Sequence, residues 1–316
     1  MNNRIESLKK AYEEIEIPDE LAAVTEAAIQ KGRMERQRKK PRRANRWVKW
    51  VGVSAAGLFV LFTVSINTMP ALASSLEQIP GLGTLVRTLQ FNKGTAGGGA
   101  ITDSTDVNVI SLHKKEGQEQ IVIHFQQNNQ PQQIANSFSV KYSEYPNMMS
   151  FAIGGARKFS AEQDLAALKN SEWVEDAYEI ISLDDSLIRF NVIFKDNVAY
   201  EVQEYKEPAQ VVLTLKPGES HAGQPPVYSV RTASSPYGES QGIYEEMLFG
   251  AEGLRTMKDK EGTYFVEAGY FKTEAEAEAK RQKWIQTHGF DERSLFIERR
   301  EALQIPEAIT VEEPAL

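Results

Sequence analysis

Apolar and polar residues alternate with different periods along the chain. Near the N-terminus, Ile5, Leu8, Tyr12 and Ile15 recur every three to four positions, the spacing of one helix face. Pro18 then starts a second such stretch, with acidic residues in its first turn, where they complement the helix dipole. The pattern predicts two short amphipathic helices. They bury little apolar area unaided, so their stripe needs a protein partner or the inner membrane surface.

An uncharged run from Val51 through Ser75 follows, and its first part is strongly apolar. About 20 apolar residues cross the hydrocarbon core of a bilayer as a helix. Trp47 and Trp50 suit the membrane interface, and the basic residues before the run favour a cytoplasmic N-terminus. We therefore predict a single transmembrane helix over residues 47–70, with the rest of the chain outside the cell membrane.

The end of this run allows more than one interpretation. Ala71 and Ala73 have the small-residue spacing that signal peptidase accepts, as in a cleaved secretory signal. A leader of 46 residues is much longer than an ordinary n-region, which argues against a plain signal peptide. The two alanines could also simply end the span and lead into an amphipathic helix, predicted over residues 76–89.

The glycine-rich stretch at residues 92–100 predicts a flexible linker, because glycine permits many backbone states. A phosphate-binding loop would need a strand before it and Lys-Ser or Lys-Thr opening a helix after it, and the sequence has neither.

From about residue 106 to 216 the period changes to two, which predicts strands of one sheet or sandwich. The alternating runs are residues 107–111, 121–125, 138–142, 188–194 and 211–215. Ser160 and Gln163 have the spacing of a capping box and predict one helix after them. The adjacent carboxylates of Asp184 and Asp185 are typical of a turn, so no calcium or acid-base site is assigned to them.

Residues 217–226 are rich in Pro and Gly, as is usual at a domain boundary. Beyond them the pattern predicts the order β-α-β-β-α-β. The expected elements are strands at 227–232, 255–258, 264–271 and 294–299, and helices at 243–251 and 274–288. Gly289 is a helix-ending signal.

Composition narrows the chemistry. The 316 residues contain no cysteine and four histidines, none of them paired at metal-ligand spacing. Thiolate catalysis, cysteine-ligated metals and metallohydrolase motifs are therefore excluded, and we expect a protein that is not an enzyme and has no cofactor. The charge is distributed unevenly along the chain. The whole chain has a net charge of −8, but residues 1–46 carry 12 basic and only 8 acidic side chains. The basic cluster adjoins the predicted span, where topology and anionic lipid account for it, so direct nucleic-acid binding is not expected.

Two sequence segments resemble those of known families. The leader text LKKAYEEIEIPDEL, one span, and the text ALASSLEQIPGLGTLVRTLQF after it resemble membrane-anchored anti-sigma factors of Gram-positive bacteria, especially the lysozyme-responsive type. The resemblance covers roughly residues 1–92. It implies that the cytoplasmic segment sequesters an extracytoplasmic-function sigma factor and that stepwise proteolysis releases it. The implied sigma-binding positions are Ile15, Ile17, Pro18, Leu21 and Val24, and the implied cleavage site is at Ala71 and Ala73.

Residues 225–300 resemble the SPOR domain, through the text YFVEAGYFKTEAEAEA and the Gly289-Phe290 pair that follows the second helix. That family folds as a four-stranded antiparallel sheet backed by two helices and binds peptidoglycan glycan strands. The first half of the usual signature is degenerate here. Candidate glycan-binding residues are Tyr228, Arg231, Tyr264 and Tyr270, although ordinary sheet packing explains each aromatic equally well.

The combined expectation is an α+β protein that holds a sigma factor inside the cell and monitors the envelope outside. The alternative is a membrane-tethered peptidoglycan-binding protein of cell division or sporulation without sigma control. The expected segments are 1–46 cytoplasmic and sigma-binding, 47–70 transmembrane, 71–104 juxtamembrane helix and linker, 105–216 mainly β, 217–226 linker, 227–301 SPOR-like and 302–316 tail.

Overall fold

A computed structural model describes residues 82–196 and 198–310. The chain divides into two compact units, Met1–Leu76 and Glu77–Leu316, and all described residues belong to the second. Within the described ranges, none of the helices has the length and apolar character needed to traverse a bilayer. The predicted transmembrane helix, the sigma-binding positions and the cleavage site all lie outside the described residues.

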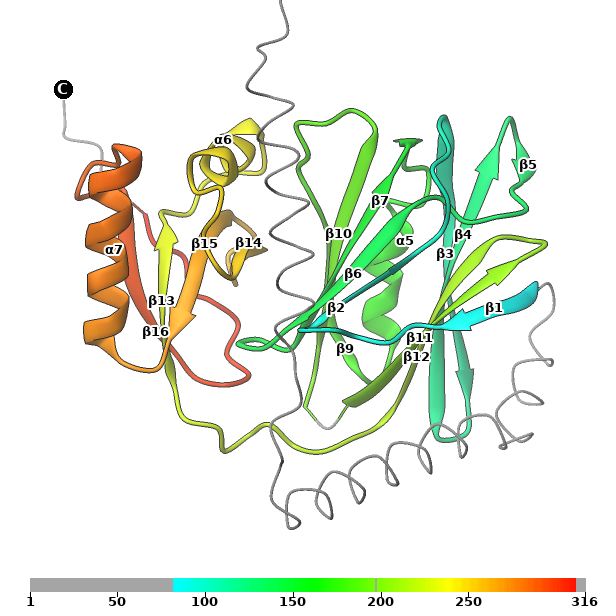
Figure 1. Cartoon of the computed structure of the whole chain (residues 1–316). Coiled ribbons are helices and arrows are strands. Elements are labelled where there is room, and N and C mark those ends of the chain that lie inside the picture. Colours follow the sequence, from blue (N-terminus) through cyan, green and yellow to red (C-terminus); the bar gives the residue numbers. More distant parts are fainter. Residues whose placement is uncertain (1–81, 197, 311–316) are drawn as a thin grey trace, which may run out of the picture. The chain divides into compact units, whose positions relative to one another are not determined.

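The first sheet of the second unit has seven strands (Figure 1). Its order is β1-β11-β12-β4-β3-β8, with β5 paired to β4, and only the β3–β8 pairing is parallel. The strands are β1 (Thr84–Thr88), β3 (Thr105–Lys115), β4 (Gln118–Gln127), β5 (Gln130–Pro131), β8 (Ala156–Lys158), β11 (Val198–Lys206) and β12 (Gln210–Pro217).

The second sheet has five antiparallel strands in the order β2-β6-β7-β10-β9. They are β2 (Thr95–Gly98), β6 (Phe138–Ser143), β7 (Met148–Gly154), β9 (Val174–Ile180) and β10 (Leu187–Phe194). The short helix α5 (Asp164–Ala167) and the 3-10 helix η1 (Leu168–Asn170) precede β9.

The two sheets form a sandwich around one apolar core. Buried side chains of the seven-stranded sheet, such as Phe125 and Leu213, belong to the same cluster as Phe151 and Phe190 of the five-stranded sheet. Phe151 and Phe190 stack with their ring centroids 4.8 Å apart. The period-two pattern predicted this core, because alternate residues of a strand face the same side.

All five strands predicted between residues 106 and 216 are confirmed as β3, β4, β6, β10 and β12. Three local predictions are wrong. Residues 84–88 of the expected helix form β1 on the edge of β11, and residues 95–98 of the expected linker form β2 on β6. The capping box is also absent, because the hydroxyl of Ser160 donates to Asp106 Oδ2 at 2.9 Å and α5 has no side-chain cap.

The C-terminal part has the predicted order β-α-β-β-α-β. Its elements are β13 (Val227–Thr232), α6 (Glu239–Met247), β14 (Leu254–Lys258), β15 (Tyr264–Phe271), α7 (Glu274–His288) and β16 (Leu295–Arg300). The strands form one antiparallel sheet in the order β14-β15-β13-β16. Thr273 and Glu276 cap α7 reciprocally, and Gly289 ends it with a φ of 71°. The SPOR assignment itself stays a prediction.

Both faces of this four-stranded sheet are covered. Val266 and Leu295 pack with Ala277 of α7 on one face. On the other face, Phe265 packs with Met148 and Ile193 of the five-stranded sheet in a separate apolar cluster. Residues 218–226 contain no helix or strand, but the parts that they join share this buried contact.

Candidate functional site: a lysine-rich cleft beside a buried charge network

The four candidate glycan-binding residues do not form one open surface. Tyr228 packs against the apolar cluster on the helix side of the sheet, and Arg231 is 0% exposed. The ring of Tyr264 contacts those of Tyr178 and Tyr237, with centroids 5.8 Å and 5.1 Å away. Tyr270 lines a cavity of the described residues.

Arg231 has a structural environment. Its guanidinium donates to Glu298 Oε2 at 3.0 Å and to the carbonyl oxygen of Glu307 at 2.9 Å. Its Cζ atom lies 3.3 Å from the centroid of the Phe265 ring. Burial lowers the pKa of Arg231, and the Glu298 carboxylate counteracts part of that effect. The guanidinium group of Arg231 thus already binds protein groups, and a glycan would need the same N–H donors.

A buried ionic network lies next to Arg231. The carboxylate of Glu267 is fully buried and accepts from Arg255 Nε at 2.6 Å, Arg300 Nη1 at 2.7 Å and the hydroxyl of Ser229 at 2.5 Å. Burial alone would raise the pKa of Glu267, but the two guanidinium groups outweigh it and lower the pKa to about 2. Glu267 is therefore ionised at neutral pH.

The same network attaches the C-terminal sheet to the turn between β6 and β7. Arg255 donates to Ser143 Oγ at 2.9 Å and to the carbonyl oxygens of Glu144 and Tyr145 at 2.8 Å and 2.6 Å. Arg300 also donates to the Tyr145 carbonyl, at 2.8 Å. The contact between the two parts therefore includes charge-assisted hydrogen bonds in addition to apolar packing.

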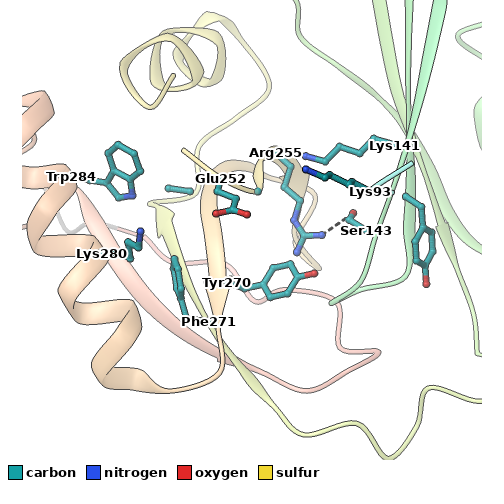
Figure 2. Close-up of a pocket in the computed structure, with 12 residues that line it drawn as sticks. Lys93, Lys141, Ser143, Glu252, Arg255, Tyr270, Phe271, Lys280 and Trp284 are labelled. Carbon is teal, nitrogen blue, oxygen red and sulfur yellow. Dashed lines mark hydrogen bonds between the residues drawn. The ribbon is translucent and has the colours of Figure 1, made fainter. Parts of the chain in front are cut away.

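A cavity of about 510 Å³ opens beside this network, and we call it the lysine cleft. It is lined by Lys93, Lys141, Tyr142, Ser143, Glu252, Gly253, Arg255, Ala268, Tyr270, Phe271, Lys280 and Trp284. Figure 2 shows Lys93 and Lys141 on one side of the cleft and Lys280 and Trp284 of α7 on the other, with Glu252 and Tyr270 between them. Its volume is within the range of ordinary small-molecule sites, about 300–1,000 Å³.

The charge of the cleft is positive. Arg255 forms an ion pair with Glu267. In contrast, Lys93, Lys141 and Lys280 form no ion pair with a carboxylate of the described residues, 82–196 and 198–310. Burial, and then the charge of Arg255, lower the pKa of Lys141. Its amine makes one long contact, 3.5 Å to the carbonyl oxygen of Leu254. Such a cleft favours an anionic ligand over a cationic one.

Sequence reasoning missed most of the cleft. Lys93 lies in the stretch predicted to be a linker, and Lys141 and Trp284 belong to no recognisable ligand-binding motif. Asp184 and Asp185 lie in a turn as predicted, where Asp184 accepts from Ser186 and Asp185 pairs with Arg157. In the part of the chain that the structure describes, no group of three or more His, Asp or Glu side chains could hold a metal ion.

Comparison with known proteins relates part of the chain to a family model and to a curated protein. Residues 43–129 match DUF4179, a domain of unknown function. The chain is also 31% identical over 91 residues to the anti-sigma-V factor RsiV of Bacillus subtilis strain 168, and this match covers 29% of each protein. The chain thus spans under a third of the length of this curated relative. The resemblance to RsiV-type anti-sigma factors that the sequence indicates is confirmed by this similarity.

Proposed function

We propose that the chain is a single-pass membrane anti-sigma factor. The similarity to an anti-sigma factor carries the proposal. In this account residues 1–46 sequester an extracytoplasmic-function sigma factor through an apolar face that includes Ile15, Ile17, Pro18, Leu21 and Val24. The span at 47–70 fixes the leader in the cytoplasm, and the region from 82 onward monitors the envelope. An envelope signal leads to proteolysis near Ala71 and Ala73, which frees the sigma factor.

The position of β1 supports the proteolytic step. This edge strand begins eleven residues after Ala73 and pairs with β11 over Thr84–Thr88. Arg87 Nε lies 2.8 Å from Glu204 Oε2, and the amide of Leu89 donates to the Val202 carbonyl at 2.8 Å. These contacts attach the chain that follows the proposed cleavage site to the sandwich, and in this account the attachment slows the proteolysis.

Deletion of residues 1–46 tests the proposal. In the host, the deletion should switch on transcription from promoters of the bound sigma factor, and the full-length variant Ile17→Asp/Leu21→Asp should do the same. The variant Ile5→Leu, which keeps an apolar side chain on the same leader, should keep the promoters silent. Mislocalisation at the cell wall with unchanged promoter activity would instead favour the alternative, a tethered peptidoglycan-binding protein.

A further inference from the structure

We propose that the lysine cleft binds an acidic saccharide, a sugar that carries a carboxylate or a phosphate group. The cleft combines three lysines, aromatic rings and one acidic side chain in a single cavity of about 510 Å³. A role of this ligand as the envelope signal rests on the proposed function, whereas the binding of the ligand to the cleft does not.

The lysines supply the anion preference. Lys93 lies in the turn before β2, Lys141 on β6 and Lys280 on α7, so cationic groups reach the cleft from three separate segments. In the view of Figure 2 the amines of Lys93 and Lys141 extend toward Arg255. An anionic oxygen of a ligand would offer Lys141 a stronger partner than its 3.5 Å contact with Leu254 O. Charge-assisted hydrogen bonds of this kind are about twice as strong as neutral ones.

The remaining lining distinguishes a sugar from a bare anion. Tyr270, Phe271 and Trp284 bring aromatic rings to the cleft, and the C–H groups of a sugar can pack against such rings. The indole Nε1 of Trp284 is shielded from solvent and has no hydrogen-bond partner among the described residues, so it is a donor that a ligand hydroxyl can satisfy. Glu252 also lines the cleft and can accept hydrogen bonds from sugar hydroxyls.

The test uses purified full-length protein and calorimetric titration with four probes. Glucuronate and glucose 6-phosphate carry a carboxylate and a phosphate, respectively, on a sugar ring. Glucose is the control without a charge, and inorganic phosphate is the control without a sugar. We expect saturable binding of at least one acidic sugar, with at least tenfold weaker binding of glucose and of inorganic phosphate. The preferred acid identifies whether a carboxylate or a phosphate is recognised. Equal binding of glucose or of inorganic phosphate, or no binding of either acidic sugar, would overturn the proposal.

Matched variants locate the binding site. Lys141→Met and Lys280→Met should each weaken binding of the acidic sugar at least tenfold, and Lys216→Met, on an exposed lysine at the end of β12, should leave it unchanged. Lys280 is exposed, so its replacement keeps the test valid even if Lys141→Met fails to fold. Unaltered affinity in Lys280→Met would contradict the assignment. Promoter activity after deletion of residues 1–46 is measured independently, so failure of ligand binding and failure of sigma control are distinguishable.

Discussion

Glu267 is the residue on which the contact between the C-terminal sheet and the sandwich depends. Its carboxylate forms ion pairs with Arg255 and Arg300, and both arginines donate to the carbonyl of Tyr145 on the other side of the contact. Loss of one partner of a buried ion pair leaves an uncompensated charge, which typically costs about 3–5 kcal/mol. Here two guanidinium groups would be left with less negative charge, and Arg300 would keep only Glu298.

We therefore predict that Glu267→Gln lowers the free energy of unfolding by about 3–5 kcal/mol at neutral pH. Urea unfolding of the purified protein, followed by tryptophan fluorescence, measures this change. Glu301→Gln removes a carboxylate from an exposed pair with Arg299 and should cost at most about 1 kcal/mol. Equal effects of the two substitutions would show that the buried network does not stabilise the fold.

The lowered pKa of Glu267 predicts a pH dependence. The folded-state pKa of about 2 is below the ordinary value of 4.5, so the stability that the ionised carboxylate provides is present above pH 4.5 and is lost as the pH falls toward 2. The thermal midpoint of the wild-type protein should fall more steeply over this interval than that of Glu267→Gln. Parallel curves for the two proteins would mean that another group dominates acid unfolding.

At the scale of elements, period two was a reliable signal and the short edge strands were not. The five strands with clear alternation were predicted because their inward residues form the core. Leu85 and Leu89 have helical spacing, but the edge of β11 provides backbone partners that a helix over these residues could not use. In β2 the glycines permit close approach instead of flexibility: a Cβ atom on Gly97 would lie 2.9 Å from the carbonyl oxygen of Phe138.

The pairing of β1 leads to a prediction about proteolysis. Arg87→Glu would place two carboxylates together, one of them the buried Glu204, so β1 should detach from β11. In the host we expect faster cleavage near Ala73 than in the wild-type protein, measured by immunoblotting of the membrane-bound fragment over time. Arg293→Glu makes the same charge change at a side chain that is 82% exposed and should leave the cleavage rate unchanged. An unchanged rate in Arg87→Glu would contradict a protective role of β1.

At the scale of the whole described unit, the sandwich and the C-terminal sheet share buried contacts that sequence patterns could not predict. The linker composition at residues 217–226 indicated two separate domains, but Phe265 packs on Met148 and the guanidinium of Arg189 forms two hydrogen bonds with Glu245 of α6, at 2.6 Å and 2.7 Å. The lysine cleft depends on the same contact, because its residues come from both parts. The period of the apolar pattern shows which face of a strand or helix a residue lies on. It does not show which other part of the chain packs against that face.

This shared contact predicts cooperative unfolding. Phe265→Ala removes a buried ring from the shared cluster and should lower the free energy of unfolding by about 3–5 kcal/mol. The unfolding midpoints of both parts should therefore fall together. Trp173 reports on the sandwich and Trp284 on the C-terminal part, so single-tryptophan variants can follow each part separately. Two separate transitions, with only that of Trp284 shifted, would contradict the shared contact.

The claim that the leader holds a sigma factor is tested most directly by cross-linking the full-length protein in its host and identifying the captured proteins by mass spectrometry. We predict that a sigma factor is recovered with the wild-type protein and is lost with the variant Ile17→Asp/Leu21→Asp. Recovery of cell-division or wall-synthesis proteins alone, or of a sigma factor in equal amounts from both proteins, would contradict the account.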